Sequence, residues 1–282
     1  MLKPFWVDLH IHTALSPCGS LEMGAPEIVS AARKAGVDVI GIADHNTCDN
    51  FPAISEAAHG DPVVLPCIET QSAEDIHTLC VFPDFETALN YKSWLWKKML
   101  PIKNDVDYFG DQVVLDHCNN ILRQEDTLLI QGSGYEVDQI VSKVQELGGL
   151  AILAHVDRAS FSYPVALGPM PADYPADAFE LSRRINSDQA AKWREDYPGR
   201  IFIRSSDSHT LDTISRANCT KMMLEAPAFD EKAVAKHVKP AAHEINCFSC
   251  GQGEEERALV PVRMKGESLW VCTRCLPKLI HG

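Results

Sequence analysis

Short apolar runs along the chain predict a set of buried strands. They occupy residues 5–12, 37–44, 62–69, 77–82, 149–155 and 200–207. Each run has the length of a strand rather than of a helix and is rich in Val, Ile, Leu or Phe. These runs are therefore the expected framework of the fold.

Helix-like segments lie between many of these runs. Residues 25–36 carry Pro26 near their start and end on Gly36, residues 84–100 begin with Asp84, and residues 135–149 end on paired glycines. Pro in the first turn, Asp at the N-cap and Gly after the last turn are helix start and stop signals. Alternation of strands and helices predicts an α/β fold with a mainly parallel sheet, and the number of strands favours a barrel.

Three other regions complete the predicted organisation. Residues 103–134 are polar and irregular and predict an excursion from the barrel, and the proline-rich residues 159–175 predict a loop. Residues 230–238 predict a helix that closes the first domain. The composition then changes, which predicts a domain at 1–241 and a cysteine-bearing tail at 242–282.

Composition and charge narrow the possible functions. The 282 residues are 45% hydrophobic, enough for a sizeable core, and no run approaches the ~18 uncharged apolar residues of a membrane-spanning helix. The N-terminus lacks the apolar run of a signal peptide, so we expect a cytoplasmic protein. A net charge of -13 argues against binding long nucleic acid. An anionic substrate is still possible, because several divalent metals at one site would make the local potential positive.

Residues that can bind metals gather at the ends of five predicted strands. They are His10 and His12, then Asp44 with His45, then Glu69, then His155, and finally Asp207 with His209. The carboxyl ends of parallel strands form one rim of the sheet, where α/β folds build their sites. His77 begins a strand instead, so it must reach this rim from a reversed strand or a hairpin partner.

Each residue also has an ordinary structural explanation. A single histidine at a strand end is commonly structural, Asp44 and Asp207 could cap helices, and Glu69 could be a loop acid. If no metal were bound, each of these separate explanations would have to hold at the same time, which is improbable for so many residues at one rim. The set therefore predicts a multinuclear metal centre at the rim.

The order of the motifs "DLHIHT", "ADHN", the isolated Glu69, "DIHTL", "AHVDR" and "SDSH" resembles the polymerase and histidinol phosphatase (PHP) family of metallo-phosphoesterases. The resemblance runs from about residue 5 to about residue 225. It implies a distorted (β/α)7 barrel with two to three divalent metal ions, Zn, Mn or Fe, at its rim.

The resemblance also implies the ligands of each ion. The first ion would be held by His10, His12, Glu69 and Asp207, the second by Glu69, His77 and His155, and the third by His45 and His209. Asp44 would orient His45 or another ligand. In the stretch "HIHTALSPCG", Pro17 stands where many relatives have an aspartate. Either the Cys18 thiolate completes the third site, favouring zinc, or Cys18 is a small buried residue, Ser16 takes no part, and that site is weak or empty.

Such a site predicts a metal-dependent phosphoric ester hydrolase acting on a phosphomonoester or small nucleotide through a metal-bridged hydroxide. Asp207 or His209 could assist proton transfer. Arg158 could contact the substrate phosphate or form a surface ion pair with Asp157 or another acid, and Arg183 and Arg184 are further candidates. The alternatives are a nuclease that acts on oligonucleotide ends and a non-catalytic regulatory or scaffolding module that binds metal.

Four of the ten cysteines lie close together near the C-terminus. The pairs Cys247–Cys250 and Cys272–Cys275 have the CxxC…CxxC spacing of a zinc ribbon, in which two knuckles present four thiolates to one structural zinc ion. The residues between the pairs predict a hairpin that turns near Lys265 and Gly266. The acidic run at 254–256 favours bracing or protein contact for this tail over nucleic-acid binding.

Overall fold

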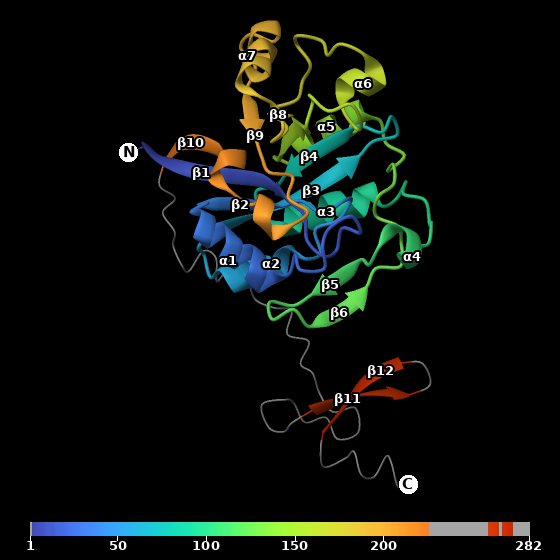
Figure 1. Ribbon diagram of the computed structural model, residues 1–282. Helices are drawn as coiled ribbons and strands as arrows, with labels where there is room; N and C mark the ends of the chain where they lie inside the picture. The colour runs from blue at the N-terminus through green and yellow to red at the C-terminus, as the bar shows by residue number, and fades with distance from the viewer. Residues whose placement is uncertain (1, 226–258, 265–266, 273–282) are drawn as a thin grey trace. The chain divides into compact units, whose positions relative to one another are not determined.

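A computed structural model describes residues 2–225, 259–264 and 267–272 of the chain (Figure 1). The chain divides into two units, Met1–Pro227 and Ala228–Gly282. The predicted boundary between residues 241 and 242 and the predicted helix at 230–238 lie outside the described residues.

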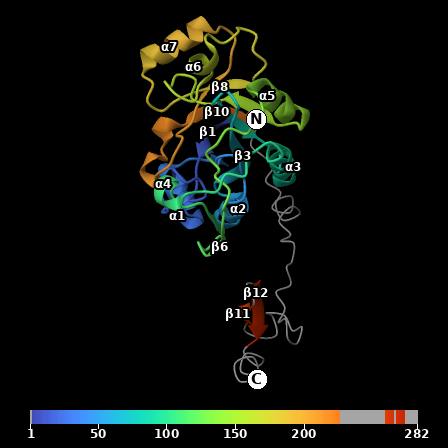
Figure 2. The same cartoon turned by 90° about the vertical axis from the view of Figure 1, so that its right-hand side faces the viewer.

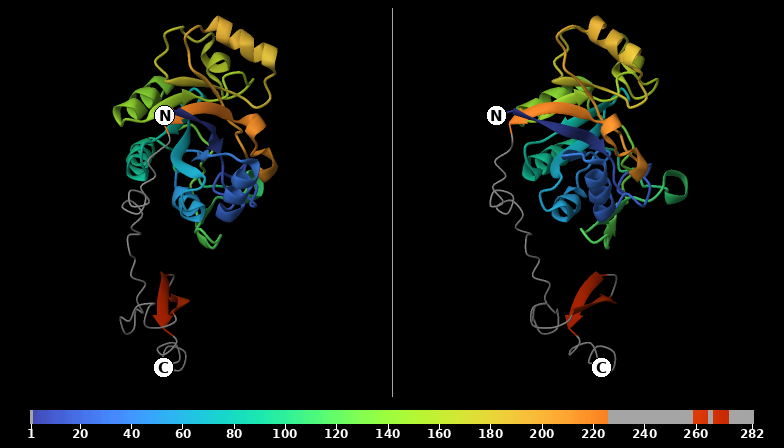
Figure 3. Two further views of the ribbon diagram at one scale, coloured as in Figure 1. Left: turned by 90° about the vertical axis from the view of Figure 1, so that its left-hand side faces the viewer. Right: turned by 60° about the vertical axis from the view of Figure 1, so that its left-hand side comes forward.

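The first unit is built on one sheet of eight strands. In the order of their pairing they are β10 (Thr220–Glu225), β1 (Leu2–Ile11), β2 (Val39–Ile42), β3 (Val63–Gln71), β4 (His77–Val81), β7 (Leu150–Leu153), β8 (Ala178–Leu181) and β9 (Phe202–Arg204). Strands β4 and β10 run antiparallel to their neighbours, and the other pairs are parallel. Figure 3 shows β10 beside β1 from two directions.

The sheet curls until its two edges almost meet. Ile11 at the end of β1 bridges Ser208 beyond β9, and the Ser208 amide donates to the His10 carbonyl at 3.1 Å. At the strands themselves, the amide of Arg204 donates to Thr220 Oγ1 at 2.6 Å, and this hydroxyl donates to the Arg204 carbonyl at 2.8 Å. The expected seven-stranded barrel is thus corrected to a nearly closed sheet of eight strands, because β10 also joins it.

Helices cover the outside of this sheet (Figure 2). They are α1 (Ala25–Ala35), α2 (Phe51–Ala58), α3 (Phe85–Leu95), α5 (Val137–Glu146), α6 (Tyr163–Leu167) and α7 (Ser187–Asp196). The helices predicted within 25–36, 84–100 and 135–149 are confirmed, and Asp84 caps α3 by accepting the Thr87 amide at 2.8 Å. Within the described residues, no helix is long and apolar enough to cross a membrane.

The strand interiors explain where the core lies. Val7, Leu9, Leu79 and Ile152 pack inside the barrel with apolar side chains from the other central strands. Ile11 packs instead on the outside, against α1 and α2. The pairing of β1 with β2 shifts register between Asp8 and Ile11, and such an irregularity reverses the faces that successive side chains occupy.

Residues 103–134 leave the barrel as predicted but are more regular than expected. They contain α4 (Val106–Phe109) and a two-stranded sheet of β5 (Val113–Leu115) and β6 (Ile121–Gln124). Residues 159–175 are mostly loop, as predicted, with the short α6 inside them.

The second unit contains an antiparallel hairpin of β11 (Leu259–Met264) and β12 (Glu267–Cys272). Met264 pairs with Glu267, which confirms the predicted hairpin, while the predicted turn at Lys265 and Gly266 lies outside the described residues. Cys247, Cys250 and Cys275 lie outside the described residues, as does the side chain of Cys272. The four-cysteine zinc site therefore stays a prediction.

Candidate metal centre

Five imidazoles surround the carboxylate of Glu69, which is almost fully buried. Oε1 lies 2.8 Å from His77 Nδ1, 3.1 Å from His155 Nε2 and 3.2 Å from His10 Nε2. Oε2 lies 3.0 Å from His45 Nδ1 and 3.3 Å from His12 Nε2. Both oxygens of one carboxylate thus face potential ligands from different strands.

Asp207 forms a second acidic point beside this cluster. Its Oδ1 lies 3.2 Å from His12 Nε2 and 3.5 Å from His10 Nε2. The ring of His209 stacks on that of His12, with centroids 4.1 Å apart, and its Nδ1 donates to the Asp207 carbonyl at 3.0 Å. All eight side chains expected at the rim therefore come together in space.

The ligand atoms are close enough to share ions. Three triplets have ligand atoms that all lie within 4.8 Å of one another, namely His10–His12–Glu69, His45–Glu69–His77 and His12–His45–His209. Glu69 belongs to two of them, which is the arrangement a bridging carboxylate requires. A cluster of imidazole and carboxylate ligands suits divalent transition metals.

Several buried atoms of this cluster have no hydrogen-bond partner. They are Glu69 Oε2, His45 Nδ1, His77 Nε2 and His155 Nδ1. His45 Nδ1 and Glu69 Oε2 are only 3.0 Å apart, yet they lack the geometry of a hydrogen bond. A buried polar atom without a partner is costly, and a cation bound between such atoms would remove that cost. The residues present therefore fit divalent ions.

The backbone around the ligands is unusual. His155 and Asp207 have positive φ angles of 31° and 47°, a region that residues other than glycine rarely adopt. Strain of this kind persists where surrounding structure enforces it and is common at functional sites. The register shift in β1 has a related effect, because it lets His10 and His12 face the centre while Ile11 packs against the helices.

Glu180, at the centre of β8, supports His10 from behind. Its Oε2 lies 3.1 Å from His10 Nδ1 and also accepts the amide of His155 at 3.1 Å. A carboxylate on one imidazole nitrogen fixes the tautomer and leaves the other nitrogen free for a metal. Glu180 was not among the residues singled out from the sequence. The available signal was a glutamate enclosed by apolar residues in "DAFEL".

Asp44 is linked to the His12 side chain through Ser16, whose hydroxyl also accepts the His45 amide at 3.3 Å. Asp44 Oδ1 accepts the Ser16 hydroxyl at 2.7 Å, and Ser16 Oγ lies 2.9 Å from His12 Nδ1. Asp44 also binds the amide and the hydroxyl of Thr13, each at 2.8 Å. Ser16 therefore takes part in the site.

Charge around the cluster explains the shifted pKa values. Burial would raise the pKa of Glu69, but the imidazoles of His77, His10 and His45 hold it well below its usual range. Burial would lower the pKa of His12, yet the nearby carboxylates of Asp207 and Glu69 raise it to about 9. In the absence of bound metal, protons on some imidazoles supply the positive charge that the carboxylates require.

Two other imidazoles have the opposite shift. Burial lowers the pKa of His77 to about 4 despite the charge of Glu69. Burial and the charge of His12 lower the pKa of His209 to about 3. At neutral pH these two rings keep their lone pairs, so they need no proton release before they bind a cation.

The remaining candidates occupy the edge of the centre. Cys18 is exposed and interacts electrostatically with His45, but it belongs to none of the three triplets. Arg158 contacts Asp207, not Asp157, whose carboxylate binds the amide and hydroxyl of Ser182.

Unlike Arg158, the two further arginines form no ion pair with a candidate metal ligand among the described residues. Arg183 donates to the Ser206 carbonyl at 3.0 Å, and Arg184 is exposed.

The fold is similar to those of several solved structures at low sequence identity. The lesion-specific endonuclease PfuEndoQ from Pyrococcus furiosus is 17% identical, with a TM-score of 0.53 over 89% of this chain and 64% of that one. A protein assigned as a metal-dependent phosphoesterase from Bifidobacterium adolescentis is 18% identical, with a TM-score of 0.52 over 72% of this chain and 87% of that one. No family model matches the chain, and no curated relative does.

A second endonuclease structure, Endonuclease Q with a 27-mer duplex that carries an abasic lesion at the active site, has a TM-score of 0.52 and 17% identity. It matches over 83% of this chain and 57% of that one. The chain thus spans less than two thirds of either endonuclease chain. These similarities establish a shared fold, a nearly closed α/β barrel.

Proposed function

We propose that the protein is a metal-dependent hydrolase of phosphate esters. The observation that carries this proposal is the buried Glu69 carboxylate with five imidazoles within 3.3 Å of its two oxygens. Hydrolases with several metals use such shared carboxylates to hold ions a few ångströms apart. Two of the similar structures belong to proteins described as a metal-dependent phosphoesterase and an endonuclease.

Each side chain has a distinct role in this proposal. Glu69 would bridge two ions. His10, His12 and Asp207 would complete one site, and His77 and His155 would complete the other. Bound ions would supply Lewis acidity and lower the pKa of the attacking water. Glu180 holds His10 and Ser16 holds His12, so neither imidazole must reorient when substrate arrives.

Arg158 and Asp207 change partners in this proposal. The Arg158 guanidinium now neutralises Asp207, and it remains 30% exposed. A cation on Asp207 would take over that neutralisation. Arg158 would then be free to bind two oxygens of a substrate phosphate. His209 lies at the outer edge of the cluster, and its low pKa suits a metal ligand rather than a proton donor.

The third ion, the identity of the metals and the tail belong to the same proposal. His45 and His209 hold the third ion, with Cys18 as an additional ligand, and Zn, Mn and Fe all suit these donors. Cys247, Cys250, Cys272 and Cys275 hold one structural zinc in a separate domain that begins near residue 242. Metal analysis of Cys272→Ser tests this part: one zinc per chain should be lost while the other metals stay.

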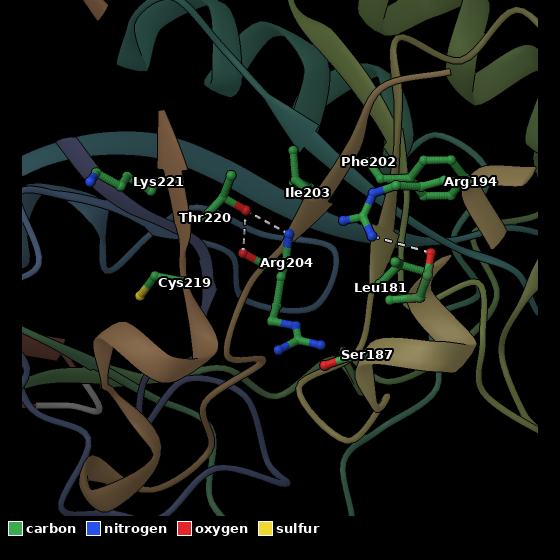
Figure 4. Close-up of a pocket in the computed structure, with 10 residues that line it drawn as sticks. Leu181, Ser187, Arg194, Phe202, Ile203, Arg204, Cys219, Thr220 and Lys221 are labelled. Atoms are coloured by element: carbon green, nitrogen blue, oxygen red, sulfur yellow. Dashed lines mark hydrogen bonds between the residues drawn. The ribbon is translucent and has the colours of Figure 1, made fainter. Parts of the chain in front are cut away.

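A phosphodiester in nucleic acid is the second candidate substrate. The net charge of -13 argues against long nucleic acid as a substrate. One similar structure nevertheless holds a duplex, so net charge alone does not exclude a nucleic-acid substrate. A hollow of about 370 Å³ at the seam between β9 and β10 is lined by Arg194, Arg204 and Lys221 (Figure 4). Such a cluster offers contacts to the phosphates of a strand that extends beyond the centre.

The test compares Glu69→Gln with the exposed control Glu56→Gln. Purified proteins are loaded with Mn²⁺ or Zn²⁺, their metal content is measured, and hydrolysis is followed on phosphomonoesters, nucleotides and oligonucleotides. Glu69→Gln should lose bound metal and nearly all turnover, because its amide is uncharged and cannot bridge two cations. Glu56→Gln should match the unaltered protein. Absence of hydrolysis by the fully loaded, unaltered protein on every substrate would refute the proposal.

A further inference from the structure

One short loop reaches both sides of the candidate metal centre. It follows His155 and runs from Arg158 to Ser162. Its turn is fixed by the Arg158 amide, which donates to the His155 carbonyl at 2.9 Å, and by Ser162 Oγ, which donates to the Arg158 carbonyl at 2.7 Å. Arg158 contacts Asp207. At the other end of the loop, Phe161 lies on His77.

The contact between Phe161 and His77 is specific. The two rings are stacked, with centroids 4.7 Å apart and an angle of 21° between their planes. The His77 amide also donates to the Phe161 carbonyl at 3.0 Å, so the loop is joined to the start of β4. Phe161 therefore sits directly on a side chain that contacts Glu69.

Two further features of Phe161 are hard to explain by packing alone. Its φ angle is 55°, a conformation that costs energy in a bulky residue. Its side chain also remains 45% exposed, so it gains only part of the burial an aromatic residue normally provides. A strained backbone that presents an aromatic ring to solvent beside a buried polar cluster is typical of a binding surface.

We infer that Phe161 is a stacking platform for the base of a nucleoside phosphate whose phosphate lies at the metal centre. This inference rests on the proposed function and names the substrate class. The exposed part of the ring offers a π-surface, and every nucleobase has a planar face that stacks on it. Arg158, on the same loop, supplies the contact to phosphate. One loop thus recognises both ends of a nucleotide unit.

Trp94, Trp96 and Tyr108 are less suited to this role. Trp94 stacks on Tyr135, and Trp96 donates its indole N–H to the Asn46 carbonyl at 2.8 Å, so both serve the core. Tyr108 on α4 is 80% exposed but contacts no candidate ligand. It is the matched control for Phe161.

The first experiment measures selectivity. The ratio of kcat/KM for a purine nucleoside monophosphate to that for ribose 5-phosphate is determined for the unaltered protein, Phe161→Ala, Phe161→Trp and Tyr108→Ala. Loss of base stacking should lower this ratio about tenfold in Phe161→Ala. Phe161→Trp should keep or raise it, and Tyr108→Ala should leave it unchanged.

The second experiment measures binding without turnover. A non-hydrolysable phosphonate analogue of a 2-aminopurine nucleoside monophosphate, and an oligonucleotide whose terminal 2-aminopurine is joined by a phosphonate linkage, are titrated with Zn²⁺-loaded protein. The fluorescence quench reports stacking. The quench should disappear in Phe161→Ala and persist in Tyr108→Ala. Quenching of the mononucleotide identifies free nucleotides as the source of the base, and quenching of the oligonucleotide alone identifies a strand end.

The outcomes separate this inference from the proposed function. Hydrolysis in which Phe161→Ala lowers kcat/KM equally for both substrates would overturn the inference, since Phe161 would then only support His77. Retention of the quench in Phe161→Ala would overturn it as well. Failure of the unaltered protein to hydrolyse any phosphate ester refutes the proposed function instead, and the quench still decides whether bases stack on Phe161.

Discussion

Glu180 shows how one buried residue determines what its neighbours can do. It is almost fully buried and lies against His10 and the amide of His155, so it contacts two candidate ligands at once. Burial would raise its pKa, but the charge of His10 lowers it below the usual range. The carboxylate is thus ionised and holds His10 by its Nδ1, so the nitrogen that faces Glu69 is Nε2.

We expect Glu180→Gln to weaken metal binding by about 10- to 100-fold, the range typical of a residue that supports a metal ligand. The amide keeps the shape but removes the charge that fixes the His10 tautomer. Competition with a chelator measures the affinity for Mn²⁺ and Zn²⁺. Glu195→Gln, on the exposed face of α7, serves as the control. An unchanged affinity in Glu180→Gln would mean that His10 needs no such support.

At the scale of elements, the excursion at 103–134 forms a sheet of its own and is attached to the barrel by apolar packing, as of Val113 on Ala14, and by polar side chains. Asn50 is buried, and its amide donates to Thr13 Oγ1 at 2.8 Å and to the Val113 carbonyl at 3.0 Å. Its oxygen accepts the amide of Leu115 at 2.9 Å. One side chain therefore connects the turn after β1 to β5.

We expect Asn50→Ala to lower the free energy of unfolding by about 2–4 kcal/mol, because it leaves buried polar groups on both elements without partners. Denaturant unfolding of the metal-free protein measures this change. Asn120→Ala, in the exposed turn between β5 and β6, removes a local bond to Asp116 and should cost less. Equal losses in the two variants would contradict a connecting role for Asn50.

The same scale shows what the sequence could and could not predict. The strands that carry His10, Glu69, His155 and Asp207 were predictable because each is a continuous apolar run with a polar residue at its end. Strand β10 was missed, since "TKMMLE" has no clear period and pairs with the distant β1. Contacts such as Ser16 on His12 depend on how a turn folds, which no local pattern specifies.

The number of strands illustrates the same limit for the barrel. Closure depends on Thr220 reaching Arg204 through its hydroxyl and on Ser208 bridging Ile11. Both contacts join segments that are far apart in sequence or separated by loops. The sequence therefore indicated a barrel but not its eighth strand or its partly open seam.

For the whole molecule, the opposed pKa shifts of the histidines set the pH dependence of stability in the metal-free protein. Burial, which alone would lower the pKa of His45, is outweighed by the charges of Glu69 and Cys18, and its pKa rises to about 9, like that of His12. The pKa of each of these histidines is higher in the folded protein than the ordinary value of 6.5 in the unfolded chain. Protonation of these histidines therefore stabilises the folded state, and this stabilisation is fully present below pH 6.5. That contribution is lost as the pH rises from 6.5 towards 9.

His77 and His209 act in the opposite direction. Their folded pKa values of about 4 and 3 lie below 6.5, so the unfolded chain binds protons more readily than the fold does. The contribution of these two neutral histidines to the stability of the folded state is present above pH 6.5. It is lost as the pH falls below 6.5, because the unfolded chain then takes up protons. The sum of the two effects gives the metal-free protein a maximum of stability near pH 6.5.

Bound metal should remove the alkaline half of this dependence. A divalent cation binds His12 and His45 only after their protons leave, so metal affinity rises with pH over the range in which the metal-free fold weakens. We therefore expect the Tm measured with a chelator to peak near pH 6.5 and fall towards pH 9, and the Tm measured with excess Mn²⁺ to keep rising through that range. A chelator-treated protein whose Tm climbs steadily from pH 6.5 to 9 would show that the carboxylates of Glu69 and Asp207 are not neutralised by protonated imidazoles.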